Sequence, residues 1–198
     1  LELTPLDPVF MATAKHPGII AIVTSLLGEN VQLHHSNLAI KPTQIGSGPV
    51  GWHHDFAYLP HTNSDLLAVM VMLDDATPQN GGMQMVRGSH KLGTVEVPID
   101  EEDIRGENTK NPFFKDPRSV ESLFGLSGSS DIVDINTKAG GVSLHHCLTL
   151  HSSPANLSGK PRRGVVFQYR ADDNYQLATR IYKETGIMVA GQHQYKIR

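Results

Sequence analysis

The chain has 198 residues, 39% of them hydrophobic and 19% charged, which is the size and composition of one globular domain with a real core. Its formal net charge is -3 and its 17 Lys and Arg residues are scattered along the chain, so we expect no nucleic-acid partner. A single cysteine, Cys147, excludes an internal disulfide, and no apolar run is long enough to cross a bilayer.

The start of the chain gives no sign of a targeting segment. Nothing there resembles a signal peptide, so we expect a soluble, cytoplasmic protein without a membrane partner. The chain opens at Leu1 rather than Met, which is consistent with a missing N-terminal segment. We expect residues 1–198 to form one domain, and the sequence does not indicate its oligomeric state.

The first thirty residues are predicted to be helical. Pro17 suits a first helical position, and an apolar stripe follows it until Gly28. After Gly28 the pattern is typical of β-structure. Strands are expected at residues 31–40, 51–59 and 66–73, with a Gly/Pro turn at 43–50. Within residues 74–82 the Asn-Gly pair predicts a hairpin turn, whose return strand begins at 83–86.

The second half of the chain begins with a long irregular segment. Residues 96–130 are polar, rich in Gly and Pro, and not periodic, so we expect them to form an active-site lid or inserted loop. Further strands are expected at residues 132–135, 141–150 and 163–170, and a helix at 175–185. Many short strands, an N-terminal helix and no βαβ alternation predict a mainly β fold, a double-stranded β-helix (cupin-like jelly roll) with flanking helices.

Three residues have the character of a metal site. In a strand, alternate side chains share a face, so His53 and Asp55 would point the same way and His54 the other. A third ligand has to come from a distant strand, and the alternating residues that lead to His151 predict such a strand. Two imidazoles and one carboxylate are the ligands of non-haem Fe(II) oxygenases and leave three coordination positions open. Since His145 shares the face of His151, periodicity leaves both open as the third ligand.

Four blocks of sequence carry a resemblance to a known family. They are HHSNLAIKP, WHHDFAYLP, LDDATPQNGGMQMVRGSHK and HSSPANLSGKPRR, within residues 33–170. In composition, order and spacing they are similar to the phytanoyl-CoA dioxygenase (PhyH-like) family of Fe(II)- and 2-oxoglutarate-dependent oxygenases. The resemblance implies that His53, Asp55 and His151 bind Fe(II), and it favours His151 over His145.

The resemblance also implies a site for the co-substrate 2-oxoglutarate. Arg162, eleven residues beyond His151, falls where the family's arginine binds the distal carboxylate, a task that suits a planar and permanently charged group. Arg163 is the alternative, because an irregular strand entry would reverse the inward face. Ser153 stands where a residue often assists the co-substrate. His35 and Lys41 lie on a strand that lines the same pocket in relatives, as co-substrate or active-site contacts.

Other positions bear on the reaction and the substrate. Asp55 disfavours halogenation, since halogenating relatives replace this carboxylate with a small residue. Val71 stands where some relatives have a tryptophan near the co-substrate. We expect Val71, Met70, Phe56 and Tyr58 to line a cavity for a partly apolar substrate, with core packing as the alternative for Met70 and Tyr58.

These features predict a dioxygenase that uses Fe(II), 2-oxoglutarate and O2 to hydroxylate an unactivated C–H bond of a small organic substrate, releasing succinate and CO2. Three alternatives stay open. The same cofactors could instead give desaturation, cyclisation, epoxidation or endoperoxidation. A cupin-like zinc protein would use the same three ligands but would have no use for Arg162 and Ser153. A non-catalytic small-molecule-binding protein would be expected to have lost a ligand or the arginine.

Overall fold

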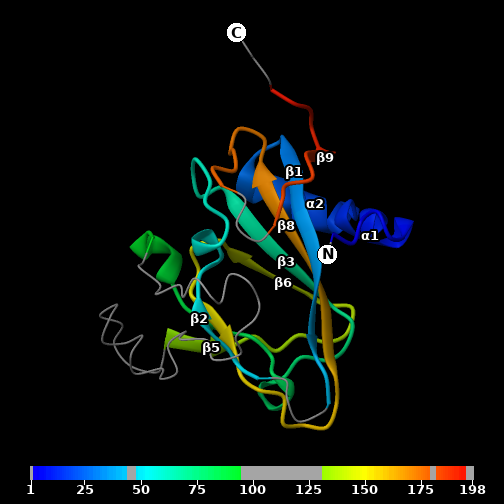
Figure 1. The fold of residues 1–198 in the computed structure, drawn as a ribbon, viewed down its shortest axis with the longest axis vertical. Helices are drawn as coiled ribbons and strands as arrows, with labels where there is room; N and C mark the ends of the chain where they lie inside the picture. The colour runs from blue at the N-terminus through cyan, green and yellow to red at the C-terminus, as the bar shows by residue number, and fades with distance from the viewer. Residues whose placement is uncertain (1, 44–47, 95–130, 179–181, 195–198) are drawn as a thin grey trace.

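The computed structural model describes residues 2–43, 48–94, 131–178 and 182–194. In these ranges the chain forms two antiparallel sheets and two N-terminal helices (Figure 1). The lid or insert expected at residues 96–130 lies outside the described residues, as does the middle of the turn expected at 43–50.

Two prolines set the starts of the helices. Helices α1 (Pro8–Ala14) and α2 (Pro17–Leu27) each begin with proline, whose missing N–H is not needed in the first turn. The side chain of Asp7 accepts a hydrogen bond from the backbone of Val9 at 2.8 Å and so caps α1. Helix α2 ends at Gly28, whose φ of 88° favours glycine. The predicted helical start and both α2 boundaries are confirmed.

Both helices pack on one face of the larger sheet (Figure 1), where Tyr169 donates a hydrogen bond to the carbonyl of Ala14 at 2.9 Å. The main apolar core lies between the helices and the larger sheet. It consists of Leu3, Ala14, Ile19, Val23, Val31, Leu33, Leu67, Val69, Val165, Phe167 and Tyr169. In the described part of the chain no single helix is long and apolar enough to span a membrane; α1 and α2, bent by 48° at their junction, meet such a test only as a pair.

The strands are distributed over two sheets, as in a jelly roll. The larger sheet has the order β6 (Val142–His146), β3 (Leu66–Met72), β8 (Arg162–Ala171), β1 (Val31–Lys41) and β9 (Ile187–Ala190). The smaller sheet has the order β2 (Val50–His53), β7 (His151–Ser153), β4 (Gln84–Val86) and β5 (Ile132–Asp134). The predicted fold class, a mainly β jelly roll with flanking helices, is confirmed.

A bulge in β1 decides which side chains of this strand face the interior. The register with β8 shifts between Leu33 and His35, so one extra residue, His34, lies in β1. Leu33 therefore faces the helices, as Tyr169 opposite it does, whereas His35 faces the inside of the jelly roll.

Beyond the bulge, the inward side chains of the larger sheet form four rows across the strands. The rows are His35–Gln168–Ala68–His145, Asn37–Val166–Met70–Ser143, Ala39–Gly164–Met72 and Lys41–Arg162. We call these rows one to four. The first row lines the same cavity as His53, Asp55 and His151, and the fourth row is cationic; the two rows between them are mostly apolar or small but include Asn37.

Three predicted elements differ from the structure. The strand expected at 51–59 ends at His53, and a short 3-10 helix, η1 (Asp55–Ala57), follows. The strand expected at 141–150 ends at His146 as β6, and after a turn the chain enters β7 of the other sheet at His151. No hairpin forms at 74–86, because β3 belongs to the larger sheet and β4 to the smaller one; the 3-10 helix η2 (Pro78–Asn80) lies in this crossover. Apolar alternation marks a strand but not the sheet to which it belongs.

The C-terminal prediction was also wrong. The described residues of the tail expected to be helical, 175–178 and 182–185, are extended or irregular. Gln176 forms an isolated bridge with His61, and the chain then enters β9, a strand that the sequence did not predict. A third 3-10 helix, η3 (Ser89–Leu92), follows β4.

Candidate metal centre and co-substrate site

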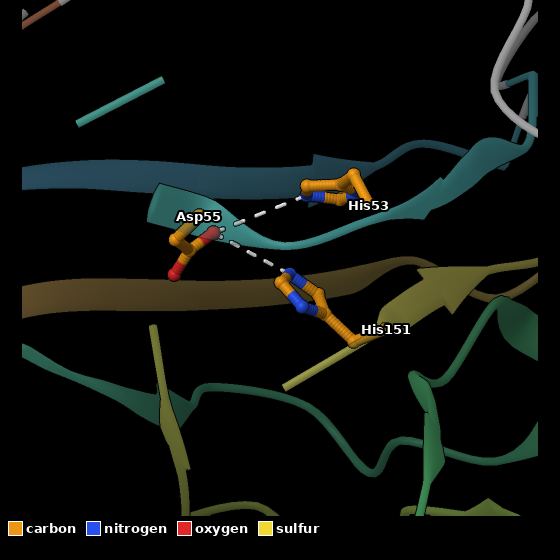
Figure 2. A group of neighbouring side chains, drawn as sticks. All are labelled: His53, Asp55 and His151. Atoms are coloured by element: carbon orange, nitrogen blue, oxygen red, sulfur yellow. Dashed lines mark ion pairs between the residues drawn. The ribbon is translucent and has the colours of Figure 1, made fainter. Parts of the chain in front are cut away.

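Three side chains from separate segments meet between the sheets. His53 lies at the end of β2, Asp55 starts η1, and His151 starts β7. Oδ1 of Asp55 is 4.0 Å from Nε2 of His53 and 3.5 Å from Nε2 of His151, and Figure 2 shows the three groups turned toward one another. One potential ligand atom from each lies within 4.8 Å of the others, which is a spacing that one metal ion can bridge.

Backbone carbonyls set the orientation of both imidazoles. Nδ1 of His53 is 2.8 Å from the carbonyl of Gly51, and Nδ1 of His151 is 2.9 Å from the carbonyl of Thr149. A carbonyl can only accept, so each Nδ1 carries the proton and each Nε2 presents a lone pair toward Asp55. This is the tautomer that a metal ligand requires.

The charge states of the three groups also suit a divalent metal. Burial lowers the pKa of His53 and holds the pKa of His151 well below its usual value, which favours neutral imidazoles. Burial alone would raise the pKa of Asp55, but the facing His151 and His145 outweigh it and lower this pKa. Two neutral imidazoles and an ionised carboxylate fit Fe(II) without any change of protonation.

A third imidazole contacts the same carboxylate. Nε2 of His145 lies 3.3 Å from Oδ2 of Asp55, and its ring centroid lies 4.3 Å from that of His151. Asp55 thus directs Oδ1 to the two predicted ligands and Oδ2 to His145. His145, which periodicity left open as a third ligand, lines the same cavity but is not one of the three grouped residues.

A cavity of about 290 Å³ opens onto the three ligands. Of the residues expected to line it, Met70 and Tyr58 do so, together with His35. The expectation was wrong for Val71, which packs in the helix-side core, and for Phe56, which packs in a separate apolar cluster. Because strand neighbours face opposite sides, Met70 and Val71 could not both line the cavity.

Two buried cations lie at the far end of the inward rows. Lys41 is 3% exposed and Arg162 4% exposed, and they pair across β1 and β8. Arg162 donates to the carbonyls of Gly81 and Ala39, both at 3.1 Å, and Lys41 donates to the carbonyl of Gly48 at 2.8 Å. Neither forms an ion pair with any carboxylate that the structure describes. Two adjacent buried cations without a counter-charge are suited to an anionic ligand.

The cationic end adjoins the metal cavity. A small second cavity is lined by Arg162 and shares Met70 and Met83 with the larger one. The two methionine side chains therefore lie between the metal ligands and the arginine. Flexible methionines can repack around a bound molecule.

The remaining residues considered for the site lie in or next to β7, β8 and η1. Ser153 is buried on β7, and its carbonyl lies 3.4 Å from Nζ of Lys41. Arg163 points outward and pairs with Asp74 at 2.8 Å, so the inward arginine is Arg162. His54 is buried, and its Nδ1 accepts a hydrogen bond from the backbone of η1 at 3.2 Å.

Sequence reasoning did not single out Gln168, Asn37 or Tyr182, which also line the cavity. Gln168 has a detectable signal, because it is a polar residue between the apolar Phe167 and Tyr169 on a buried strand. Tyr182 has no such signal in the sequence. Its segment was expected to be helical, and Tyr182 reaches the cavity only by long-range packing.

Comparison with known proteins agrees with this geometry. A family model described as phytanoyl-CoA dioxygenase (PhyH) matches residues 2–164. The probable alpha-ketoglutarate-dependent hypophosphite dioxygenase of Stutzerimonas stutzeri is 36% identical over 161 residues, covering 80% of this chain and 52% of the relative. The ectoine dioxygenase of Halomonas elongata is 30% identical over 174 residues, covering 85% of this chain and 52% of the relative.

The fold has solved relatives as well. The crystal structure of EctD from S. alaskensis with 2-oxoglutarate and 5-hydroxyectoine superposes with a TM-score of 0.68 at 28% identity, covering 88% of this chain and 56% of that chain. The chain spans about half the length of the curated relatives it matches. The family match over residues 2–164 shows that the chain belongs to the phytanoyl-CoA dioxygenase (PhyH) family.

Proposed function

We propose that the protein is an Fe(II)- and 2-oxoglutarate-dependent dioxygenase that hydroxylates an unactivated C–H bond of a small organic molecule. The main support is that His53, Asp55 and His151 converge beside a cavity. A second, adjoining cavity is lined by the buried Arg162. The relatives named above as dioxygenases support the same class of reaction.

The chain's own residues account for binding and orientation. His53, Asp55 and His151 would hold Fe(II) from one side and leave its other side open to the cavity. Iron, when bound, would supply the redox chemistry with O2, and each turnover would convert one 2-oxoglutarate to succinate and CO2. Arg162 would bind the distal carboxylate of 2-oxoglutarate through its guanidinium, with Lys41 beside it as a second positive charge.

Further residues would shape the reaction space. Ser153, whose carbonyl lies near Nζ of Lys41, would assist the binding of 2-oxoglutarate. His35 would contact a molecule bound in the cavity that it lines. Apolar side chains such as Met70 and Leu59 would exclude water from the reacting carbon. We also propose a cytoplasmic location, which the lone, buried thiol of Cys147 supports.

Two features weigh against the alternatives. A zinc hydrolase of the cupin kind needs no buried cation pair, and a non-catalytic binding protein needs no intact ligand set. Desaturation, cyclisation, epoxidation and endoperoxidation use the same cofactors and differ in product alone. Hydroxylation is the simplest outcome when the cavity holds one small substrate beside the metal.

The test is consumption of 2-oxoglutarate with a pooled library of small organic molecules, Fe(II) and O2. We expect succinate to form in proportion to products that are 16 mass units heavier, and we expect Asp55→Ala to abolish both signals. Asp134→Ala, which removes an exposed carboxylate of β5 bonded to Gln84, is the matched control and should remain active. Products lighter by two mass units would instead indicate desaturation, and zinc retained without succinate formation would contradict the proposal.

A further inference from the structure

The inward face of the larger sheet has two polar ends. Row four, Lys41 and Arg162, is cationic, whereas row one contains His35, Gln168 and His145. Gln168 lies six positions after Arg162 on β8, a span of roughly 20 Å along an extended strand. In the proposed function the distal carboxylate of 2-oxoglutarate binds at the cationic end. The polar groups of row one are therefore available to another ligand.

Rows one and two carry buried polar atoms that have no hydrogen-bond partner in the part of the chain that the structure describes. Gln168 is 2% exposed, and its Nε2 donor has no hydrogen-bond partner among the described residues. In the next row, the buried Oδ1 of Asn37 also lacks one within the described ranges. Both residues line the 290 Å³ cavity. A buried polar group without a partner is unfavourable, so such atoms in a cavity wall point to a ligand.

Tyr182 fixes the orientation of this wall. Its ring stacks on His35 with centroids 3.9 Å apart and planes 8° apart, and its hydroxyl accepts a hydrogen bond from Nδ2 of Asn37 at 2.8 Å. Because Nδ2 is used, Asn37 offers an acceptor, Oδ1, while the hydroxyl hydrogen of Tyr182 is not used in that bond. Tyr182 lies beyond residues 2–164, to which the family match extends.

The charges around the cavity restrict what the wall can bind. Among the described lining residues there is no Lys or Arg, and the one carboxylate is the metal ligand Asp55. A carboxylate, phosphorus oxyanion or ammonium group placed against Gln168 would lose its hydration without gaining a counter-charge. A neutral group that both accepts and donates would satisfy Gln168 and Asn37 together.

We propose that Gln168 and Asn37, the latter oriented by Tyr182, bind a neutral hydrogen-bonding group of the substrate, namely a carboxamide, lactam or hydroxyl group. This inference rests on the proposed function and specifies its substrate class. The cavity volume of about 290 Å³ is at the lower end of ligand sites, so the substrate is small. Gln168 acts by binding substrate, and no step of the oxidation itself passes through it.

The test compares four probes with similar carbon chains: butyramide, butan-1-ol, butyrate and butylammonium. Each is titrated by calorimetry into the anaerobic protein loaded with Fe(II) and 2-oxoglutarate. We expect butyramide and butan-1-ol to bind at least tenfold more tightly than the two charged probes. Gln168→Leu should weaken butyramide about tenfold, the usual effect of losing one buried hydrogen bond. Gln168→Glu should reverse the charge preference in favour of butylammonium.

Controls separate this inference from misfolding and from the proposed function. The affinity for 2-oxoglutarate should be unchanged in Gln168→Leu, because the cationic end is intact, and Gln84→Leu on β4, outside the cavity, should bind all probes as the native protein does. Tyr182→Phe, which removes one hydroxyl, should weaken butyramide in the same direction as Gln168→Leu.

Three results would overturn the inference while leaving the proposed function intact. They are a preference for butyrate, no binding of either neutral probe by protein that holds 2-oxoglutarate, and equal behaviour of the Gln168→Leu and Gln84→Leu variants. Failure of the native protein to bind 2-oxoglutarate would instead remove the proposed function, and this inference with it.

Discussion

The buried ammonium group of Lys41 makes the stability of the fold depend on alkaline pH. Burial, together with repulsion from Arg162, lowers the pKa of Lys41 from 10.5 to about 8. Between these two values the unfolded chain carries a proton on Lys41 that the folded protein has lost. The free energy of unfolding therefore contains a contribution that rises as the pH increases from about 8 to 10.5, and this contribution is constant below pH 8.

The size of the effect follows from the pKa difference, which corresponds to about 3 kcal/mol of destabilisation at neutral pH. Two other buried groups act in the opposite sense. Burial raises the pKa of Cys147 to about 12 and also raises the pKa of Tyr169, so these groups ionise first in the unfolded chain. Their contributions fall at alkaline pH and partly mask that of Lys41. The informative quantity is the stability difference between the native protein and Lys41→Met, in which they cancel.

The assay is denaturant unfolding of the metal-free protein without 2-oxoglutarate, at several pH values from 7.5 to 9.5. Relative to Lys41→Met, the native protein should gain about 2 kcal/mol between pH 8 and 9.5. Lys91→Met, at an exposed lysine of η3, is the control and should follow the native profile. A constant difference between the native protein and Lys41→Met would refute the reasoning, because it would show that Lys41 keeps an ordinary pKa.

Three further changes test other parts of the structure. Arg162→Lys keeps a charge but loses the planar fork, so the affinity for 2-oxoglutarate should fall about 10- to 100-fold with Fe(II) binding unchanged; equal affinity by calorimetry would exclude Arg162 from the co-substrate site. His145→Phe removes the imidazole 3.3 Å from Oδ2 of Asp55, so Fe(II) affinity, measured by competition with a chelator, should fall about tenfold; an unchanged value would mean that His145 does not orient the carboxylate. Tyr169→Phe removes the bond to the carbonyl of Ala14 and should destabilise the fold by about 1–2 kcal/mol; an unchanged unfolding midpoint would contradict that role for the hydroxyl.

The closeness of His53 and Asp55 could be predicted from the sequence because it depends on short-range geometry. The interval between His53 and Asp55 keeps their side chains close whether the chain continues as a strand or turns into η1, as it does. The choice of Arg162 over Arg163 rested on its interval from His151 in the family; β8 buries Arg162 and exposes Arg163, as alternation along a strand requires.

Features that depend on long-range pairing could not be predicted in the same way. The residues before His151 alternate throughout, yet β6 ends at His146 and a turn leads to β7 of the other sheet at His151. The bulge at His34 reverses the inward face of β1, and no residue type in that stretch marks it. Tyr182 reaches the cavity by stacking on His35, 147 positions earlier in the chain, which local patterns do not encode.

The most direct test of the central claim is anaerobic titration of the purified apoprotein with Fe(II) and then with 2-oxoglutarate, while the visible absorption is recorded. We predict a weak metal-to-ligand charge-transfer band that forms with one equivalent of each in the native protein, is weakened in Arg162→Ala, and is lost in Asp55→Ala. A native protein that shows no band and retains zinc in preference to iron would contradict the account.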